Sequence, residues 1–129
     1  MKRTWFFLPV KAARLLLLTD SEGAILLEKR PPSGIWGGLW SLPEADLEQD
    51  VTELCQRRWG ISVLNSQDGA GMRHSFSRYH FDITPCHVQV AARPGRVQED
   101  AGLHWSSDRD IAQFALPAPV ARLLRQLQD

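Results

Sequence analysis

The stretch RLLLLTDSEGAILLEKR, Arg14 to Arg30, decides the fold. Its four consecutive leucines predict a strand at Arg14–Thr19 that is buried on both faces, because a strand with one solvated face would alternate apolar and polar side chains. Asp20–Gly23 is typical of a tight turn, in which Gly23 supplies the positive φ. Ala24–Arg30 then returns as the second strand, and the proline pair that follows ends it. The stretch therefore predicts a β-hairpin.

The remainder of the chain adds further strands and two main helices. The predicted elements are an apolar stretch at Thr4–Val10, a short strand at Trp36–Leu42, a helix at Asp46–Trp59, strands at Met72–Phe76 and Tyr79–Val90, a polar loop at Ala92–Asp100, a strand at Leu103–Trp105, a short helix at Asp108–Phe114 and a final helix at Pro119–Leu127. This order predicts a single domain over residues 1–129, of the α+β (mixed α/β) class.

Two apolar patterns define the interior of this domain. Residues at helical spacing form one face of the first helix, which Asp46 or Pro43–Glu44 would start and Gly60 would end: Leu47, Val51, Leu54, Cys55 and Trp59. Apolar side chains of the long strand change parity, from Tyr79, Phe81 and Ile83 to Cys86, Val88 and Val90. A β-bulge near Thr84–Pro85 would explain both the change and the proline.

Composition limits the function. Lys and Arg number 15, as do Asp and Glu, so the net charge is zero and strong autonomous binding to nucleic acid is not expected. The longest apolar run, Leu15–Leu18, is far too short to cross a bilayer, and without a signal peptide we expect a cytoplasmic protein. Cys55 and Cys86 are too few for a four-thiolate metal or iron–sulfur site, and we expect two buried free thiols.

The order of hairpin, glycine-rich turn, amphipathic helix and Gly60–Ile61 resembles the Nudix fold, which implies a mixed sheet packed against two helices. In that family an R-E-x-x-E-E-x-G core supplies carboxylates to Mg²⁺, because a hard cation on a diphosphate needs anionic oxygen ligands. At those positions this chain has Glu53, Leu54, Cys55, Gln56, Arg57 and Arg58. The paired glutamates have become arginines, so the resemblance implies the frame without the hydrolytic site.

Other catalytic patterns are weak. The four histidines are not at ligand spacing, and neither a GxSxG nor a Walker A loop occurs. Glu44 and Asp46 fit helix capping better than acid/base chemistry. We therefore expect no catalytic residue, no metal site and no cofactor in this chain.

Three stretches resemble the C-terminal domain of MutY-type adenine DNA glycosylases. They are EKRPPSGIWGGLWSLPE at Glu28–Glu44, RHSFSRYHFDITP at Arg73–Pro85, and APVARLLRQL at Ala118–Leu127. The second resembles that domain's H-x-F-S-H loop. The stretches follow the family's order and span most of the chain.

The resemblance implies a Nudix-like domain that has lost hydrolase activity and recognises 8-oxoguanine paired with adenine in double-stranded DNA. The complete family protein also carries an N-terminal glycosylase domain with a four-cysteine iron–sulfur cluster, which removes the mispaired adenine in base-excision repair. We therefore expect the chain to be the C-terminal part of a bacterial glycosylase, monomeric and not catalytic by itself. A natural stand-alone protein is the alternative.

By the same resemblance the segment Arg73–Arg78 holds the site. Oxidation turns guanine N7 from an acceptor into an N–H donor, so a reader needs an acceptor there. The Ser77 hydroxyl, or more sharply a backbone carbonyl of the turn, could serve. Phe76 is a rigid apolar plate that could wedge between bases. His74 and Ser75 would support the turn, and Arg73 completes the binding segment.

Arg78 stands where the family has His, and its guanidinium could pair with a phosphate or stack on a base. Without the motif, Phe76 would be read as core and Ser77 as a turn former.

Two other functions compete with lesion recognition. An active Nudix hydrolase on an oxidised nucleotide would need the carboxylates that positions 54, 57 and 58 lack. A protein-interaction module would not depend on Phe76 or Ser77 for discrimination between 8-oxoguanine and guanine.

Overall fold

The computed structural model describes residues 7–91, 102–107 and 110–128, and the side chains of 127 and 128 are outside that description. The predicted loop Ala92–Asp100 and parts of the predicted elements at Thr4–Val10 and Asp108–Phe114 therefore lie outside the described residues. None of the helices that are described is long and apolar enough to span a membrane.

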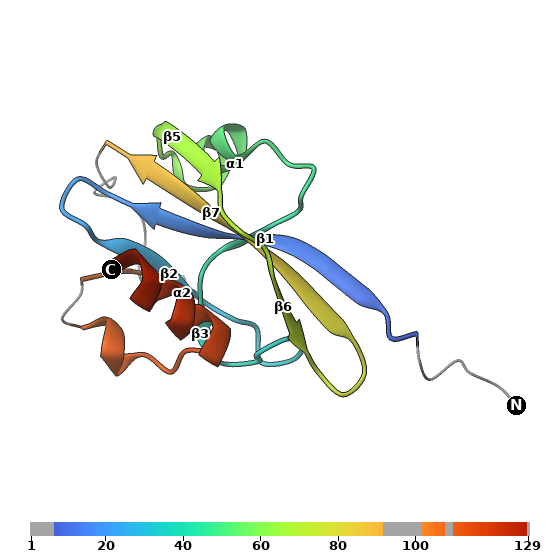
Figure 1. The fold of residues 1–129 in the computed structure, drawn as a ribbon. Coiled ribbons are helices and arrows are strands. Elements are labelled where there is room, and N and C mark those ends of the chain that lie inside the picture. Colours follow the sequence, from blue (N-terminus) through green and yellow to red (C-terminus); the bar gives the residue numbers. More distant parts are fainter. Residues whose placement is uncertain (1–6, 92–101, 108–109, 129) are drawn as a thin grey trace, which may run out of the picture.

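A mixed sheet of eight strands forms the centre of the molecule (Figure 1). The main path runs β3-β2-β1-β7-β5, while β4 pairs with β1, β6 with β7 and β8 with β2. The bounds are β1 Val10–Thr19, β2 Ile25–Lys29, β3 Trp40–Ser41, β4 Glu44–Ala45, β5 Val63–Asp68, β6 Met72–Ser75, β7 His80–Val90 and β8 Leu103–Ser106. β1 and β7 are parallel over ten residue pairs, and the other pairings are antiparallel.

Helices α1 (Val51–Trp59) and α2 (Ala118–Gln128) cover opposite faces of the sheet, with a 3₁₀ turn, η3 (Ile111–Gln113), before α2. The predicted α+β class, with a mixed sheet packed against two helices, is confirmed.

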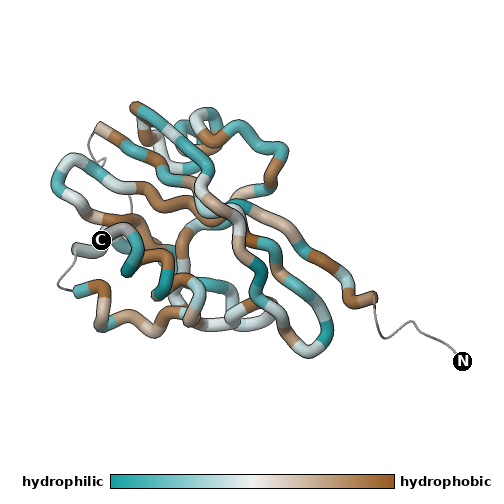
Figure 2. Tube along the Cα trace, in the orientation of Figure 1, coloured by the Kyte–Doolittle hydropathy of each residue, from teal (hydrophilic) through white to brown (hydrophobic). Residues whose placement is uncertain are grey.

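The leucine run of β1 supplies both cores, as its sequence predicts. Leu16 and Leu18 pack with α1, whereas Leu15 and Leu17 pack with α2, and each is at most 1% exposed. Figure 2 shows hydrophobic residues in the strands at the centre of the molecule, with hydrophilic residues frequent in the turns around them. Because β1 buries apolar side chains on both of its faces, it contributes to the core on each side of the sheet.

The predicted bulge at Thr84–Pro85 is wrong. β7 pairs with β1 without a register shift, so its parity changes because the two helices cover different faces at its two ends. Pro85 lies between the end of β5 and the start of β6, where Gly69 N–H donates to its carbonyl at 2.7 Å. The N–H that proline lacks would point to this same gap, where no strand needs it.

Helix α1 begins later than predicted. Its N-cap is Asp50, whose carboxylate accepts from the Glu53 N–H, and Glu44–Ala45 belongs to β4 instead. The segment between them is a turn, in which Leu47 is 42% exposed and not part of the helix face. The predicted end at Gly60 is confirmed, with φ of 67°.

Two further expectations need correction, and one strand was not predicted. The predicted strand at Trp36–Leu42 is limited to Trp40–Ser41, because the residues before it form a tight turn. The predicted helix near Asp108–Phe114 is the short η3. Strand β5 escaped prediction, since this polar edge strand has no apolar alternation.

Candidate functional site

The β6–β7 hairpin extends from the body of the sheet, beside the first half of β1 (Figure 1). We call residues Phe76–Tyr79 the hairpin tip, which the Phe76 N–H closes by donating to the Tyr79 carbonyl at 2.8 Å. The predicted site segment, Arg73–Arg78, therefore runs along β6 and over this tip.

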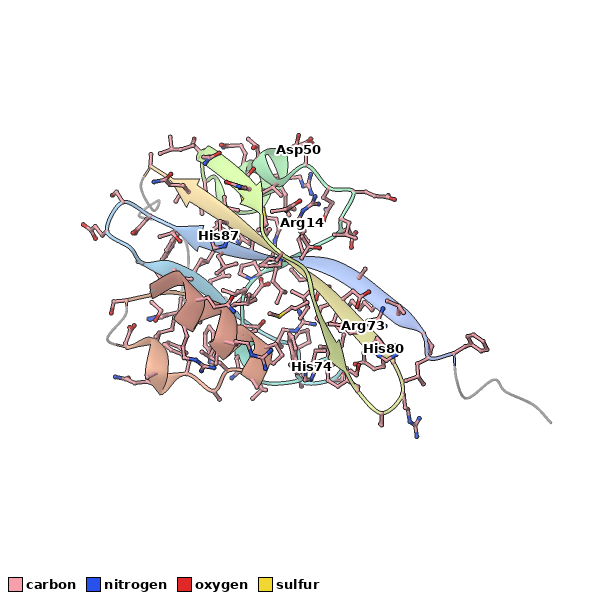
Figure 3. The ribbon with its side chains drawn as sticks, viewed as in Figure 1. Arg14, Asp50, Arg73, His74, His80 and His87 are labelled. Atoms are coloured by element: carbon pink, nitrogen blue, oxygen red, sulfur yellow. The ribbon has the colours of Figure 1, made fainter. Side chains whose placement is uncertain are left out.

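Two cross-strand pairs fix the sides of the hairpin. Arg73 makes two bonds to Asp82, at 2.6 and 2.9 Å, and these hydrogen bonds hold the pKa of the Asp82 carboxyl below its usual range. The Ser75 hydroxyl lies 2.7 Å from Nδ1 of His80. Figure 3 shows Arg73 and His80 on the two strands, below the crossing of β1 and β7. Both pairs join the two strands of the hairpin.

The tip shares with the residues below it a group of rings that we call the aromatic cluster: Trp36, His74, Phe76, Tyr79 and Phe81. The Phe76 ring centroid is 4.7 Å from that of His74 and 4.8 Å from that of Tyr79. Phe76 is half-buried against the α2-side core, the buried cluster that contains the apolar residues of α2. Its position is therefore compatible with both interpretations, as a core residue and as a contact surface. Phe81, by contrast, is completely buried.

Ser77 and Arg78 are the exposed residues of the tip. Among the described residues no carboxylate pairs with Arg78, and no backbone N–H donates to the Ser77 carbonyl. The structure thus brings Phe76, Ser77 and Arg78 together at the surface. Arg73 is engaged on the side of β6, and His74 lies underneath.

Sequence reasoning missed Trp36, Tyr79, His80 and Asp82 as parts of this site. Three of them could have been found by counting outwards from a turn at Ser77–Arg78, which places Tyr79 opposite Phe76, His80 opposite Ser75 and Asp82 opposite Arg73. Trp36 carries no such signal, since it comes from a loop far away in the sequence.

The side chains of α1 that correspond to the expected metal site do not fit a divalent cation. Leu54 is 4% exposed in the core. Arg57 lies 3.7 Å from Glu53, and Arg58 bonds to Glu28 at 2.6 Å. No group of three carboxylate, imidazole or thiol side chains that could hold a metal occurs in the part of the chain that the structure describes.

Arg14 closes the space at the start of α1, close to Asp50 (Figure 3). It makes two bonds to Asp68, at 3.0 and 3.1 Å, and donates to the carbonyls of Asp46 and Leu47. The hydrogen bond from Arg14 lowers the pKa of the Asp68 carboxyl. Cys55 and Cys86 are free and buried, and burial raises the pKa of both thiols to about 11. The predicted pair of buried free thiols is confirmed.

The profile of the NUDIX domain matches residues 14–126, which is most of the chain. The chain belongs to the NUDIX domain family. The frame that the sequence resembled is therefore shown, and the replaced carboxylates of α1 are departures within that family.

Solved structures with this fold include both binding domains and hydrolases. The C-terminal domain of mouse MUTYH, in complex with human PCNA, superimposes with a TM-score of 0.75 at 18% identity, covering 92% of this chain and 87% of that one. The NUDIX domain of Shewanella oneidensis NrtR, complexed with ADP ribose, gives 0.63 at 15% identity, covering 95% and 87%. RenU, a Nudix hydrolase of M. smegmatis, gives 0.59 at 22% identity, covering 95% and 88%. These identities establish the fold alone.

Proposed function

We propose that this NUDIX domain is the lesion-recognition module of a MutY-type adenine DNA glycosylase and reads 8-oxoguanine opposite adenine in double-stranded DNA. The observation that carries the proposal is the hairpin tip. It presents Ser77 and Arg78 to solvent above the aromatic cluster, in the segment whose sequence resembles the family's reading loop. The likeness of the fold to the mouse MUTYH domain supports it.

The chemistry of the tip suits the lesion. The N7–H of 8-oxoguanine is a donor where guanine has an acceptor. The Ser77 carbonyl can only accept, so it would distinguish the two bases more sharply than the Ser77 hydroxyl, which can also donate. Phe76 offers an apolar edge beside it, and Arg78 would neutralise a phosphate or stack on a base.

The charge distribution limits what the module does alone. Most arginines near the sheet are paired with carboxylates, and the net charge is zero. Few phosphates can be neutralised, so the domain should bind DNA weakly at physiological salt. We propose that a glycosylase domain elsewhere in the protein, with its iron–sulfur cluster, supplies most of the affinity and all of the base removal, at the nucleoid of a bacterial cytoplasm.

The test is a binding comparison with the 129-residue chain at low ionic strength. Fluorescence anisotropy would measure its affinity for matched duplexes that contain 8-oxoguanine or guanine opposite adenine. We expect a preference for the oxidised duplex, which Phe76→Ala and Ser77→Ala reduce, while Ser66→Ala on the exposed face of β5 leaves it intact. An unchanged preference in both tip variants would favour a protein-interaction module instead.

A second assay addresses the hydrolase alternative. The chain is incubated with Mg²⁺ and 8-oxo-dGTP, and phosphate release is followed. We expect no turnover above background, because Arg57 and Arg58 occupy positions that would have to be anionic. Clear turnover would contradict the proposed function.

A further inference from the structure

Trp36 has an unusual backbone. Its φ is 53°, and among the residues that the structure describes it is the one residue other than glycine with a positive φ. A bulky side chain disfavours this left-handed conformation, which glycine adopts freely. Gly34, Gly37 and Gly38 surround it, so the loop holds a tryptophan at the one position where a further glycine would suit the backbone best.

The indole ring of Trp36 lies under the hairpin. Its centroid is 5.4 Å from that of Phe81, 6.1 Å from that of His74 and 6.3 Å from that of Phe76. It thus contacts the buried base of the hairpin, the end of β6 and the first residue of the hairpin tip. No other residue of the aromatic cluster comes from outside the hairpin.

The loop that carries Trp36 is held on both sides. A Cβ on Gly37 would lie 2.4 Å from the Pro32 carbonyl oxygen, so the chain there is packed against itself. Arg30 donates through Nε to the Ile35 carbonyl at 3.2 Å and bonds to Glu44 at 3.1 Å. These contacts attach the loop to the end of β2 and to β4. The loop therefore fixes the position of the Trp36 ring relative to the sheet.

We propose that Trp36 is a positioning residue for the hairpin tip. Its ring supports Phe76 from below and so sets where Ser77 stands relative to a bound base. The packing of the ring and of the loop holds the strained backbone of Trp36 in this conformation. The consequence for lesion reading rests on the proposed function, whereas the support of the tip can be tested without DNA.

Two substitutions separate the ring from the turn. Trp36→Gly removes the ring while it relieves the strained backbone, so a residue that only shapes the turn would be replaced without loss. Trp36→Phe restores an aromatic ring at the same position. Phe114→Leu is the matched control, because Phe114 packs in the same α2-side core and its ring contacts are with Trp40 and His104, which lie outside the hairpin.

Hydrogen exchange followed by NMR gives the first readout. The amide of Phe76, bonded to the Tyr79 carbonyl, reports the tip, and the amide of Leu16, bonded to the Pro43 carbonyl, reports the body. We expect Trp36→Gly to speed exchange at Phe76 by about tenfold or more, with a smaller change at Leu16, and Trp36→Phe to stay within about threefold of the wild type. Equal acceleration by Phe114→Leu would overturn the proposal.

The second readout is the binding preference for the 8-oxoguanine duplex. We expect Trp36→Gly to lose most of it and Trp36→Phe to retain it. If Trp36→Gly keeps both the slow exchange at Phe76 and the preference, the positioning role is overturned and the proposed function stands. If the wild type shows no preference while exchange at Phe76 still rises in Trp36→Gly, the proposed function fails and the support of the tip by Trp36 stands.

Discussion

Helix α1 and Phe76 of the hairpin tip pack on opposite faces of the sheet. The polar side chains of the two regions differ in whether they are paired. Around α1 the charged groups bind one another: Arg58 holds Glu28, and Arg14 holds Asp68. At the hairpin tip, Ser77 and Arg78 extend into solvent. The comparison teaches that the arginines of α1 at the positions expected to bind metal are paired with carboxylates, whereas the hairpin tip leaves Ser77 and Arg78 exposed.

The largest expected effect concerns the joint between hairpin and body. Phe81 is completely buried and contacts Trp36, so Phe81→Ala should lower the free energy of unfolding by about 3–5 kcal/mol. Urea denaturation followed by circular dichroism would measure it. Phe76→Ala, at a half-buried position, should cost clearly less. Equal effects would mean that the tip is as much a part of the core as its base, and the comparison would break.

The second prediction tests whether α1 has lost the ability to bind a metal ion. In the family frame position 54 carries a glutamate, but here Leu54 is in the core. Leu54→Glu should destabilise by about 2–4 kcal/mol, because a buried carboxyl has no partner. Leu54→Met should cost less than about 1.5 kcal/mol. Thermal unfolding with and without Mg²⁺ is the measurement, and a Leu54→Glu variant that Mg²⁺ stabilises would show that the metal site is still latent.

These predictions also mark what the sequence could specify. The hairpin at Arg14–Arg30 was predicted because its pattern is local: a leucine run, a turn and a return strand. The end of α1 followed from Gly60 for the same reason. Its start was misplaced because Arg14, from another strand, binds the carbonyls of Asp46 and Leu47 and leaves Asp50 as the cap. Such a contact is tertiary, and the periodicity of the local sequence does not reveal it.

The candidate site divides in the same way. The motif located Phe76, Ser77 and Arg78 within one segment, and the structure places them together at the tip. It could not reveal that Trp36 lies beneath them, since a positive φ at tryptophan contradicts the local preference and is imposed by packing. The parity change in β7 was seen, but its cause was assigned to a bulge, because the sequence does not say which face each helix covers.

The third prediction compares two similar ion pairs. Arg14→Met removes a half-buried guanidinium that bonds to Asp68 and to two backbone carbonyls, and should cost about 1–2 kcal/mol. Arg73→Met removes the exposed pair with Asp82 on the hairpin and should leave the midpoint of urea unfolding close to that of the wild type. The reverse order would show that charges are more important to the hairpin than to the body.

The smallest effect is the dependence of these pairs on pH. Hydrogen bonds from arginine lower the pKa of both Asp68 and Asp82 in the folded state. The stability that they contribute is therefore present above the unfolded pKa of about 4 and is lost as the pH falls through the folded pKa. Asp68→Asn should cost no more than about 1 kcal/mol at pH 7, after allowance for solvent screening, and should approach the wild type as the pH falls below the folded pKa of Asp68.

High salt should distinguish the stability contribution of Asp68 from that of Asp82. Urea unfolding would be repeated in about 1 M NaCl, where the Debye length is about 3 Å. The effect of Asp82→Asn should then disappear, because Asp82 and its partner Arg73 are both exposed. The effect of Asp68→Asn should persist in part, because the Arg14 side chain is only 18% exposed. If salt removes both effects alike, the Arg14–Asp68 pair is no better shielded from solvent than the Arg73–Asp82 pair. The electrostatic difference between the surroundings of α1 and the hairpin would then be contradicted.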